Sequence, residues 1–134
     1  MNIEMATRLR DYLADPENED TFAMEQYAQK TTCGTKFCIA GHTVLLSGGS
    51  VSFKTSYLTT ALGYSLTTNW WFDAEGKPVR VAQHARELLG LTPVQAIELF
   101  EGMFYTKGYE DLELEYLTVD DAVKELDYLI AKAS

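Results

Sequence analysis

Hydrophobic residues near the start of the chain recur every three or four positions, with charged residues between them. These positions are Ile3, Ala6, Leu9 and Leu13. Because an α-helix turns once in about 3.6 residues, the pattern predicts an amphipathic helix over residues 3–14. The polar segment ADPENED ends this helix. We expect a second, short helix over residues 20–29, with its apolar side chains, including Phe22 and Tyr27, turned inward.

The pattern changes in the middle of the chain, where the apolar residues between residue 36 and residue 47 would cover almost every face of a helix. Such a segment is typical of a helix surrounded by other elements, and Gly48 and Gly49 are expected to end it. The apolar residues of segment 50–70 fit a helix, short strands, or both. The next segment, WWFDAEGKPVRV, has turn-forming residues between two short apolar runs and predicts a small β-hairpin around residues 69–81.

Helix ends are marked most clearly in the last third of the chain. A helix over residues 81–89 is expected to stop at Gly90, and Thr92 followed by a proline has the usual order of a cap and a first-turn residue. This order predicts a further helix over residues 93–101. Thr118, with an aspartate three residues later, is a variant of the capping box and predicts the start of the last helix.

These segments together predict a mainly α fold, a compact helical bundle of about five helices with the hairpin beside it. The chain has 134 residues, of which 46% are hydrophobic and 23% charged, so it suits a single domain over residues 1–134. Trp70 and Trp71 are more typical of a core than of a ligand site, although two adjacent residues of a strand cannot both point inward. The other residues expected in the core are Leu9, Leu13, Tyr27, Ile39, Leu45, Leu88, Leu89, Ile97, Phe100, Leu126 and Ile130.

Nothing in the sequence predicts export or membrane insertion. The first twenty residues mix acids with apolar residues and contain neither an uninterrupted apolar stretch nor a small-residue cleavage site, so no secretory signal is expected. The longest weakly polar run, residues 37–49, is too short and too rich in glycine, serine and threonine to cross a bilayer. We therefore expect a cytoplasmic protein without membrane contact, in which both cysteines are reduced thiols.

The net charge of −9 argues against nucleic-acid binding, because a grip on phosphate backbones requires lysines and arginines. Residues 81–100 imitate a helix-turn-helix, but a recognition helix needs Arg, Lys, Asn or Gln, and the polar residues of the second helix are Gln95, Glu98 and Glu101. The charge is also unevenly divided. Residues 91–134 contain ten carboxylates and three lysines, a net charge of −7, whereas residues 26–72 contain no Asp or Glu.

Each part of this charge division suggests a binding site. The acid-free segment could hold a small anionic or nucleotide-like ligand, helped by helix N-terminal amides near Thr35. Alternatively, a buried central segment simply avoids carboxylates because their burial is costly. The acidic last third could steer association with a basic partner. The candidate ligand-binding residues are Lys30, Lys36, Lys54 and Thr35, and the candidate partner-binding residues are Glu110, Asp111, Glu113 and Glu115.

The segment CGTKFCIAGH holds both cysteines and one of the two histidines of the chain. With His84, residues Cys33, Cys38 and His42 have the ligand types of a tetrahedral zinc site. However, the two cysteines lack the spacing of a knuckle turn, and free cysteines are most often small buried apolar residues. Cys33 could also be a nucleophile near a helix N-terminus, but no hydrolase signature surrounds it. We therefore assign no catalytic residue, no metal and no cofactor.

Three segments, FAMEQYA, CGTKFCIAGH and VAQHARELLGLTPVQAIELF, together resemble a loose group of small uncharacterised phage and bacterial proteins. The group shares a Cys-Gly-Thr-x-x-Cys-Ile-Ala-Gly motif and an Ala-x-x-Leu-Leu-Gly-Leu-Thr helix pair. The resemblance covers about two thirds of the chain and is poor over residues 50–78. It implies a small accessory protein without an assigned activity. His42 stands where such proteins often have tryptophan, which implies a packing role.

The function expected from these observations is that of a noncatalytic cytoplasmic binding protein. It would be a phage-encoded accessory or host- or defence-modulating protein that acts through its acidic surface or by holding a small anionic ligand. Its partner would be a host or defence protein with a basic surface. The alternative is a small enzyme or zinc-binding domain that uses Cys33, Cys38 and His42.

Overall fold

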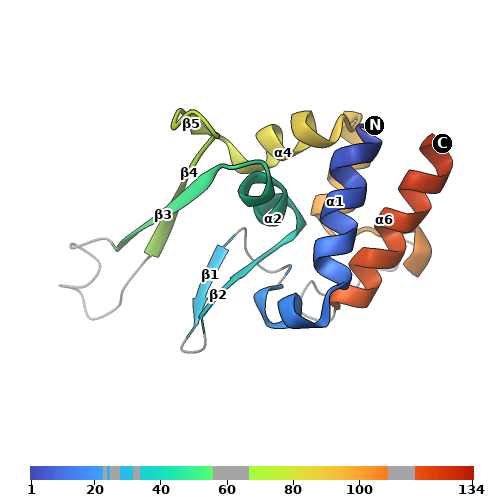
Figure 1. Ribbon diagram of the computed structural model, residues 1–134, viewed down its shortest axis with the longest axis horizontal. Helices are drawn as coiled ribbons and strands as arrows, with labels where there is room; N and C mark the ends of the chain where they lie inside the picture. The colour runs from blue at the N-terminus through green and yellow to red at the C-terminus, as the bar shows by residue number, and fades with distance from the viewer. Residues whose placement is uncertain (23, 25–27, 32–33, 56–66, 109–116) are drawn as a thin grey trace.

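The structure is a computed structural model of the chain, and it describes all residues except 23, 25–27, 32–33, 56–66 and 109–116 (Figure 1). Of residues 19, 28–31, 34–36, 54–55 and 67–68 it describes the backbone alone. The elements in chain order are α1 (Ile3–Ala14), η1 (Pro16–Thr21), β1 (Ala28–Thr31), β2 (Gly34–Phe37), α2 (Ile39–Leu46), β3 (Ser50–Thr55), β4 (Thr67–Phe72), β5 (Pro78–Val79), α4 (Val81–Leu89), α5 (Pro93–Phe100), η2 (Tyr105–Lys107) and α6 (Val119–Ala133).

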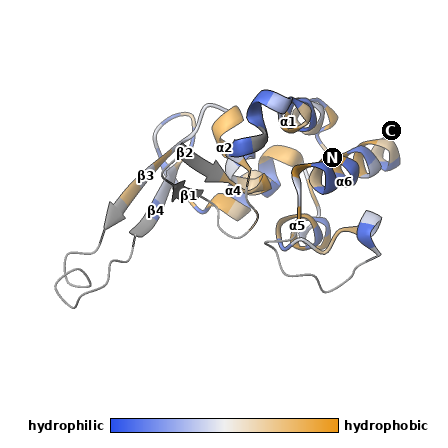
Figure 2. Cartoon of the chain, turned by 90° about the horizontal axis from the view of Figure 1, so that it is seen from below, coloured by the Kyte–Doolittle hydropathy of each residue, from blue (hydrophilic) through white to orange (hydrophobic). Residues whose placement is uncertain are grey.

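The fold is mainly α with a small antiparallel sheet, as the sequence predicts, and the described residues form five α-helices. Figure 1 shows α1 and α6 side by side at one end of the molecule and the β3–β4 hairpin projecting from the other. In Figure 2 the helices are banded in orange and blue, so each has an apolar and a polar side. No helix in the described part of the chain has the length and hydrophobicity needed to cross a membrane.

Hydrogen bonds of Asn2 join the N-terminal end of α1 to the C-terminal end of α4. Asn2, which sequence periodicity did not single out, caps α1 because its Oδ1 accepts the Met5 N–H at 3.1 Å. The Asn2 N–H donates to the Leu89 carbonyl at 2.7 Å, and its side-chain amide donates to the Leu88 carbonyl at 3.2 Å. Gly90 ends α4 with a φ of 62°, as expected, and a Cβ there would lie 2.9 Å from the Asn2 nitrogen.

Six of the predicted core residues are buried: Leu9, Leu13, Ile39, Leu89, Phe100 and Leu126. Leu45, Leu88 and Ile130 are half-buried against them, and Tyr27 lies outside the described residues. Ile97 is a wrong prediction, since its side chain is 57% exposed. The helix α5 turns Ala96 and Leu99 inward instead. Phe104, between α5 and η2, is fully buried and was not predicted.

Two expected helix boundaries are wrong around the first hairpin. A helix over residues 20–29 is not formed, because η1 ends at Thr21 and residues 28–31 are strand β1. This strand pairs antiparallel with β2 over four residues, so the helix predicted over residues 36–47 begins at Ile39 and not at residue 36. The pairing satisfies backbone groups that a helix would satisfy within itself. Phe22 is nevertheless buried, as predicted, and bridges to Phe37.

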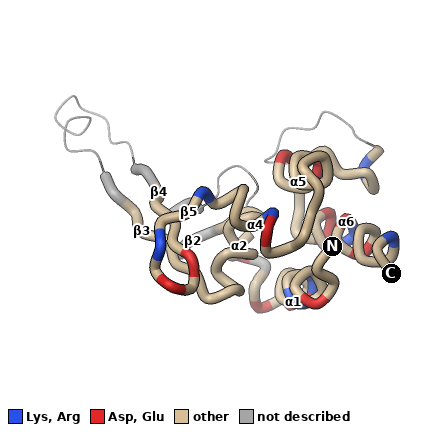
Figure 3. The backbone as a smooth tube through the Cα atoms, turned by 90° about the horizontal axis from the view of Figure 1, so that it is seen from above, with Lys and Arg blue, Asp and Glu red and all other residues tan. Residues whose placement is uncertain are grey.

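The three-stranded sheet has the order β3-β4-β5, with both pairs antiparallel. The hairpin predicted around residues 69–81 is confirmed, and the segment before it, which the sequence left open, supplies β3 and most of β4. The turn between β4 and β5 is held by Asp73, whose Oδ1 accepts the N–H groups of Glu75 and Lys77, both at 2.9 Å. Both hydrogen bonds lower the pKa of the Asp73 carboxyl, and the bond from the Lys77 N–H has the larger effect. Figure 3 shows charged positions gathered at this turn.

Candidate functional site

Cys38 is buried at the start of α2, as predicted, with 3% of its surface exposed. Burial raises the pKa of the thiol to about 11 and outweighs the nearby amides of Ala40 and Gly41, which lower it. The thiol is therefore protonated at neutral pH. Because the thiolate is the nucleophile and the metal ligand, Cys38 is in an inert state.

His42 is also buried, in a pocket of aromatic rings. Its Nε2 lies 2.9 Å from the Thr21 carbonyl oxygen, which can only accept, so this nitrogen carries the hydrogen. The ring centroids of Tyr12 and Phe37 lie 5.3 and 5.5 Å from that of His42. Burial lowers the pKa of the imidazole to about 4, against a smaller opposing effect of the Thr21 carbonyl. A neutral, packed His42 fits the role that the resemblance implies.

The part of the chain that the structure describes contains no cluster of metal-binding side chains that would support the zinc interpretation. There, no three His, Cys, Asp or Glu side chains are close enough to share a metal ion. Cys33 lies outside the described residues. His42 directs one ring nitrogen at Thr21, and His84 lies on α4, where its charge acts on Asp73 of the β4–β5 turn.

The lysine-bearing candidate site is divided between two sheets. Lys30 and Thr35 are Cα partners in the β1–β2 pair, and Lys36 is next to Thr35 on β2, but Lys54 lies on β3 in the other sheet. The expected helix N-terminus at Thr35 is wrong, because Thr35 lies inside a strand and α2 begins four residues later at Ile39. Only the backbone of these candidates is described, so their side chains stay candidates on sequence grounds.

The candidate partner-binding carboxylates, Glu110, Asp111, Glu113 and Glu115, lie outside the described residues. Several other carboxylates of the acidic third have structural roles. Glu125 is only 2% exposed, although a charge count places it with the surface acids. Asp127 pairs with Arg10 of α1 at 2.8 Å, and Asp121 caps α6 and lies 3.6 Å from the Lys107 ammonium.

A hollow lies beside the exposed side chain of Trp70. Trp70 and Trp71 are consecutive on β4, so they point to opposite sides of the sheet. Trp71 is 4% exposed and donates from Nε1 to Asn69 Oδ1 at 2.8 Å, whereas Trp70 is 57% exposed. The sequence expectation is thus correct that both tryptophans cannot be core residues.

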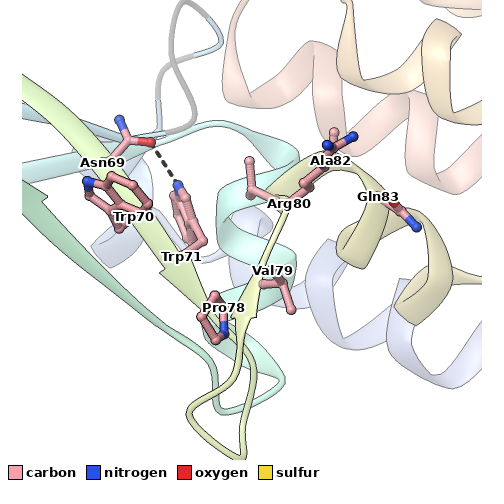
Figure 4. Close-up of a pocket in the computed structure, with 9 residues that line it drawn as sticks. Asn69, Trp70, Trp71, Pro78, Val79, Arg80, Ala82 and Gln83 are labelled. Atoms are coloured by element: carbon pink, nitrogen blue, oxygen red, sulfur yellow. Dashed lines mark hydrogen bonds between the residues drawn. The ribbon is translucent and has the colours of Figure 1, made fainter.

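The hollow has a volume of about 700 Å³ and lies between β4 and the first turn of α4 (Figure 4). Figure 4 shows Asn69, Trp70 and Trp71 on one side of it and Arg80 and Ala82 on the other. A second, smaller hollow of about 320 Å³ shares Ala82 and continues along α4 to α5. Exposed and half-buried apolar surface therefore extends from β4 across α4.

Arg80 is the one ionisable side chain among the described residues that line the larger hollow. It is exposed, and no ion pair or side-chain hydrogen bond to another described residue holds it. By contrast, Arg86 in the smaller hollow donates from Nε to the Leu91 carbonyl at 3.2 Å. The larger hollow offers an indole, apolar walls and one cation, which suit binding. No cysteine, serine, histidine or carboxylate is among the described residues that line it.

Sequence reasoning missed Arg80 as a site residue because it searched for clusters of lysines. The signal that could have found it is the alternation of Trp70 and Trp71 on a strand, which exposes one of them, followed by a turn that brings the next arginine back beside that strand. In comparisons with protein-family models, with curated proteins and with solved structures, nothing matches the chain.

Proposed function

We propose that this protein is a noncatalytic binding protein of the cytoplasm and that its ligand or partner occupies the hollow beside Trp70. The observation that carries the proposal is a tryptophan that is 57% exposed and lines an apolar hollow, together with an arginine that has no ion pair to another described residue. Tryptophan and arginine are the residues that most often dominate binding energy at protein interfaces. An exposed indole of this size otherwise loses the stabilisation that its burial would bring.

The states of the buried candidates support binding over catalysis. A thiol enzyme needs a lowered thiol pKa and an accessible imidazole, but burial raises the pKa of Cys38 and lowers that of His42. A zinc site needs a deprotonated thiol and a free ring nitrogen directed at it. The Trp70 hollow combines an exposed indole, apolar walls and a cation, which is the chemistry of a binding site.

A role as a phage-encoded accessory protein that modulates a host or defence protein rests on the sequence resemblance alone. A basic partner surface is favoured by the charge of residues 91–134. Arg80 favours a partner that brings at least one carboxylate to the hollow. These two requirements are compatible when the partner has a basic surface and an acidic segment, since they concern different parts of this chain.

The test is a capture experiment with the immobilised full-length chain and matched variants. Trp70→Ala removes the exposed indole, and Val94→Ala, on the outer side of α5, truncates a side chain that is 63% exposed and lies outside the hollow. We expect species retained by the wild type to be lost with Trp70→Ala and kept with Val94→Ala. If Trp70→Ala retains everything and Cys33→Ser or His42→Ala abolishes retention or an activity, the enzyme or metal alternative replaces this proposal.

A further inference from the structure

One edge of β4 is open over most of its length. On one side, β4 pairs with β3 at all six of its residues. On the other side, β5 pairs only with Trp71 and Phe72. The chain then leaves the sheet, because Arg80 caps α4 and Val81 begins the helix. Within the described part of the chain, the backbone of residues 67–70 therefore has a strand neighbour on one side only.

The hollow lies at this open edge. Asn69 and Trp70 line it from β4, while Val81 and Ala82 line it from α4. Neighbouring strands lie about 4.8 Å apart, so a strand that continued the line of β5 past Val79 would run through this space. Figure 4 shows the space where β4 and the start of α4 diverge. Unpaired backbone groups on a strand edge are a template for another strand.

We propose that an extended, acidic segment of a partner protein adds to the sheet as a strand along residues 67–70 of β4. This inference rests on the proposed function and names the class of partner for the same hollow. Main-chain hydrogen bonds to β4 would supply affinity that is independent of sequence, and alternate side chains would supply specificity. Alternate side chains of the added strand would lie on the Trp70 side of the sheet, and the others would lie on the Trp71 side.

The charge of the segment follows from Arg80. Val79 pairs with Trp71 as the last residue of β5, and Arg80 follows it in the chain. Arg80 therefore lies near the position opposite Trp70, where an added strand would begin. No described carboxylate lines the hollow with Arg80, so a carboxylate of the segment can form a charge-assisted hydrogen bond there. A nucleic acid is disfavoured, because one arginine in a chain of net charge −9 offers little attraction for a phosphate backbone.

The test uses a phage-displayed library of random decapeptides selected on the immobilised full-length protein. We expect enriched peptides with alternating β-branched or aromatic residues, at least one Asp or Glu, and no proline in the alternating run. In fluorescence polarisation, Trp70→Ala should lower the affinity for the best synthetic peptide about tenfold or more, as at an interface hot spot. Arg80→Glu should lower the affinity for this peptide by a similar factor. The same variant should bind more tightly to a peptide in which Lys replaces the acidic residue.

The added-strand geometry has its own matched control in the peptide. N-methylation at every second residue blocks the amides that face β4 in one of the two possible registers, and in the other it blocks amides that face solvent. One N-methylated series should therefore lose binding, and the other should keep it. Both protein variants change exposed side chains, so circular dichroism and the unfolding midpoint should match those of the wild type.

Four results would overturn the inference. Enriched peptides could be helical or proline-rich, both N-methylated series could bind equally, or the open edge could be occupied by a second copy, seen as a dimer that Trp70→Ala dissociates. An absence of any enriched peptide would overturn it as well. In each case the proposed function would survive if Trp70→Ala still removed a retained species in the capture experiment, so the two failures are distinguishable.

Discussion

The His42 imidazole is neutral between the rings of Tyr12 and Phe37, and its pKa is about 4 in the folded protein against an ordinary 6.5. Between these two values the unfolded chain binds a proton that the folded chain does not, so the free energy of unfolding falls as the pH decreases. The full stabilisation is present above pH 6.5 and is lost as the pH approaches 4. The loss is up to about 3 kcal/mol, at about 1.4 kcal/mol per pKa unit.

This pH dependence is measured by urea unfolding between pH 7 and pH 4.5, values that bracket most of the interval between the two pKa values of His42. His42→Phe keeps a ring in the pocket and removes the titrating group, so its unfolding free energy should vary less with pH over this interval. His84→Gln is the control, because His84 is the other histidine of the chain and lies on α4. In a His84→Gln background, His42→Phe should still reduce the slope. Equal slopes for the wild type and His42→Phe would contradict the assignment.

Cys38 has a raised thiol pKa, of about 11, and is closed to reagents by burial. In a Cys33→Ser background we expect no reaction of Cys38 with an aromatic disulfide reagent in the native protein at pH 8, and a stoichiometric reaction after unfolding. Cys38→Ala should lower stability by about 1 kcal/mol and leave binding at the Trp70 hollow intact. Fast native-state labelling, or zinc that survives dialysis and is lost in Cys38→Ala, would favour the metal or enzyme alternative.

At the scale of elements, a buried carboxylate joins η2 to α6. The two oxygens of Glu125 accept the Tyr105 N–H at 3.0 Å, the Thr106 N–H at 3.0 Å and the Thr106 hydroxyl at 2.9 Å. Glu125→Gln places an amide donor against these donors, so we expect a loss of about 2 kcal/mol in the unfolding free energy. The exposed Glu101→Gln should change it by less than about 0.5 kcal/mol. Equal effects of the two substitutions would contradict this role of Glu125.

The helix α5 illustrates where periodicity fails to orient an element. Apolar residues occupy most of its positions, so two different sides could be the inner one. Leu91, Leu99 and Phe104 fill the core, and Val94 and Ile97 are left outside. The pattern predicts the helix correctly, but the side that is covered depends on which neighbouring elements reach it.

At the scale of the whole molecule, the division of charge separates two modes of binding. Replacing Glu110, Asp111, Glu113 and Glu115 by their amides should reduce the salt dependence of binding to a basic partner, because exposed charges act over about one Debye length, about 8 Å at physiological salt. Replacing Lys30, Lys36 and Lys54 by Gln should instead weaken the binding of a small anionic ligand. Titrations at low and high salt measure both effects. If neither set changes affinity while Trp70→Ala does, binding is confined to the hollow.

The helix ends were predictable because they depend on contacts within about four residues. The Thr118–Asp121 capping box, the Thr92 cap and the Gly90 stop form in the structure as the sequence indicates. The β4–β5 hairpin was predictable for the same reason, since its turn bonds join residues at most four positions apart. A mainly α fold follows from these local signals together.

Tertiary structure decided the features on which function depends. The pairing of β1 with β2 overrides a helical pattern, and the burial of Glu125 depends on backbone donors 19 and 20 residues away in the sequence. The hollow exists because β5 ends after two residues and α4 turns away from β4. The sequence alone determines that one of Trp70 and Trp71 faces outward, since adjacent side chains of a strand point to opposite faces. Which of them does so depends on which side of the sheet the helices cover, and that is a property of packing between distant segments.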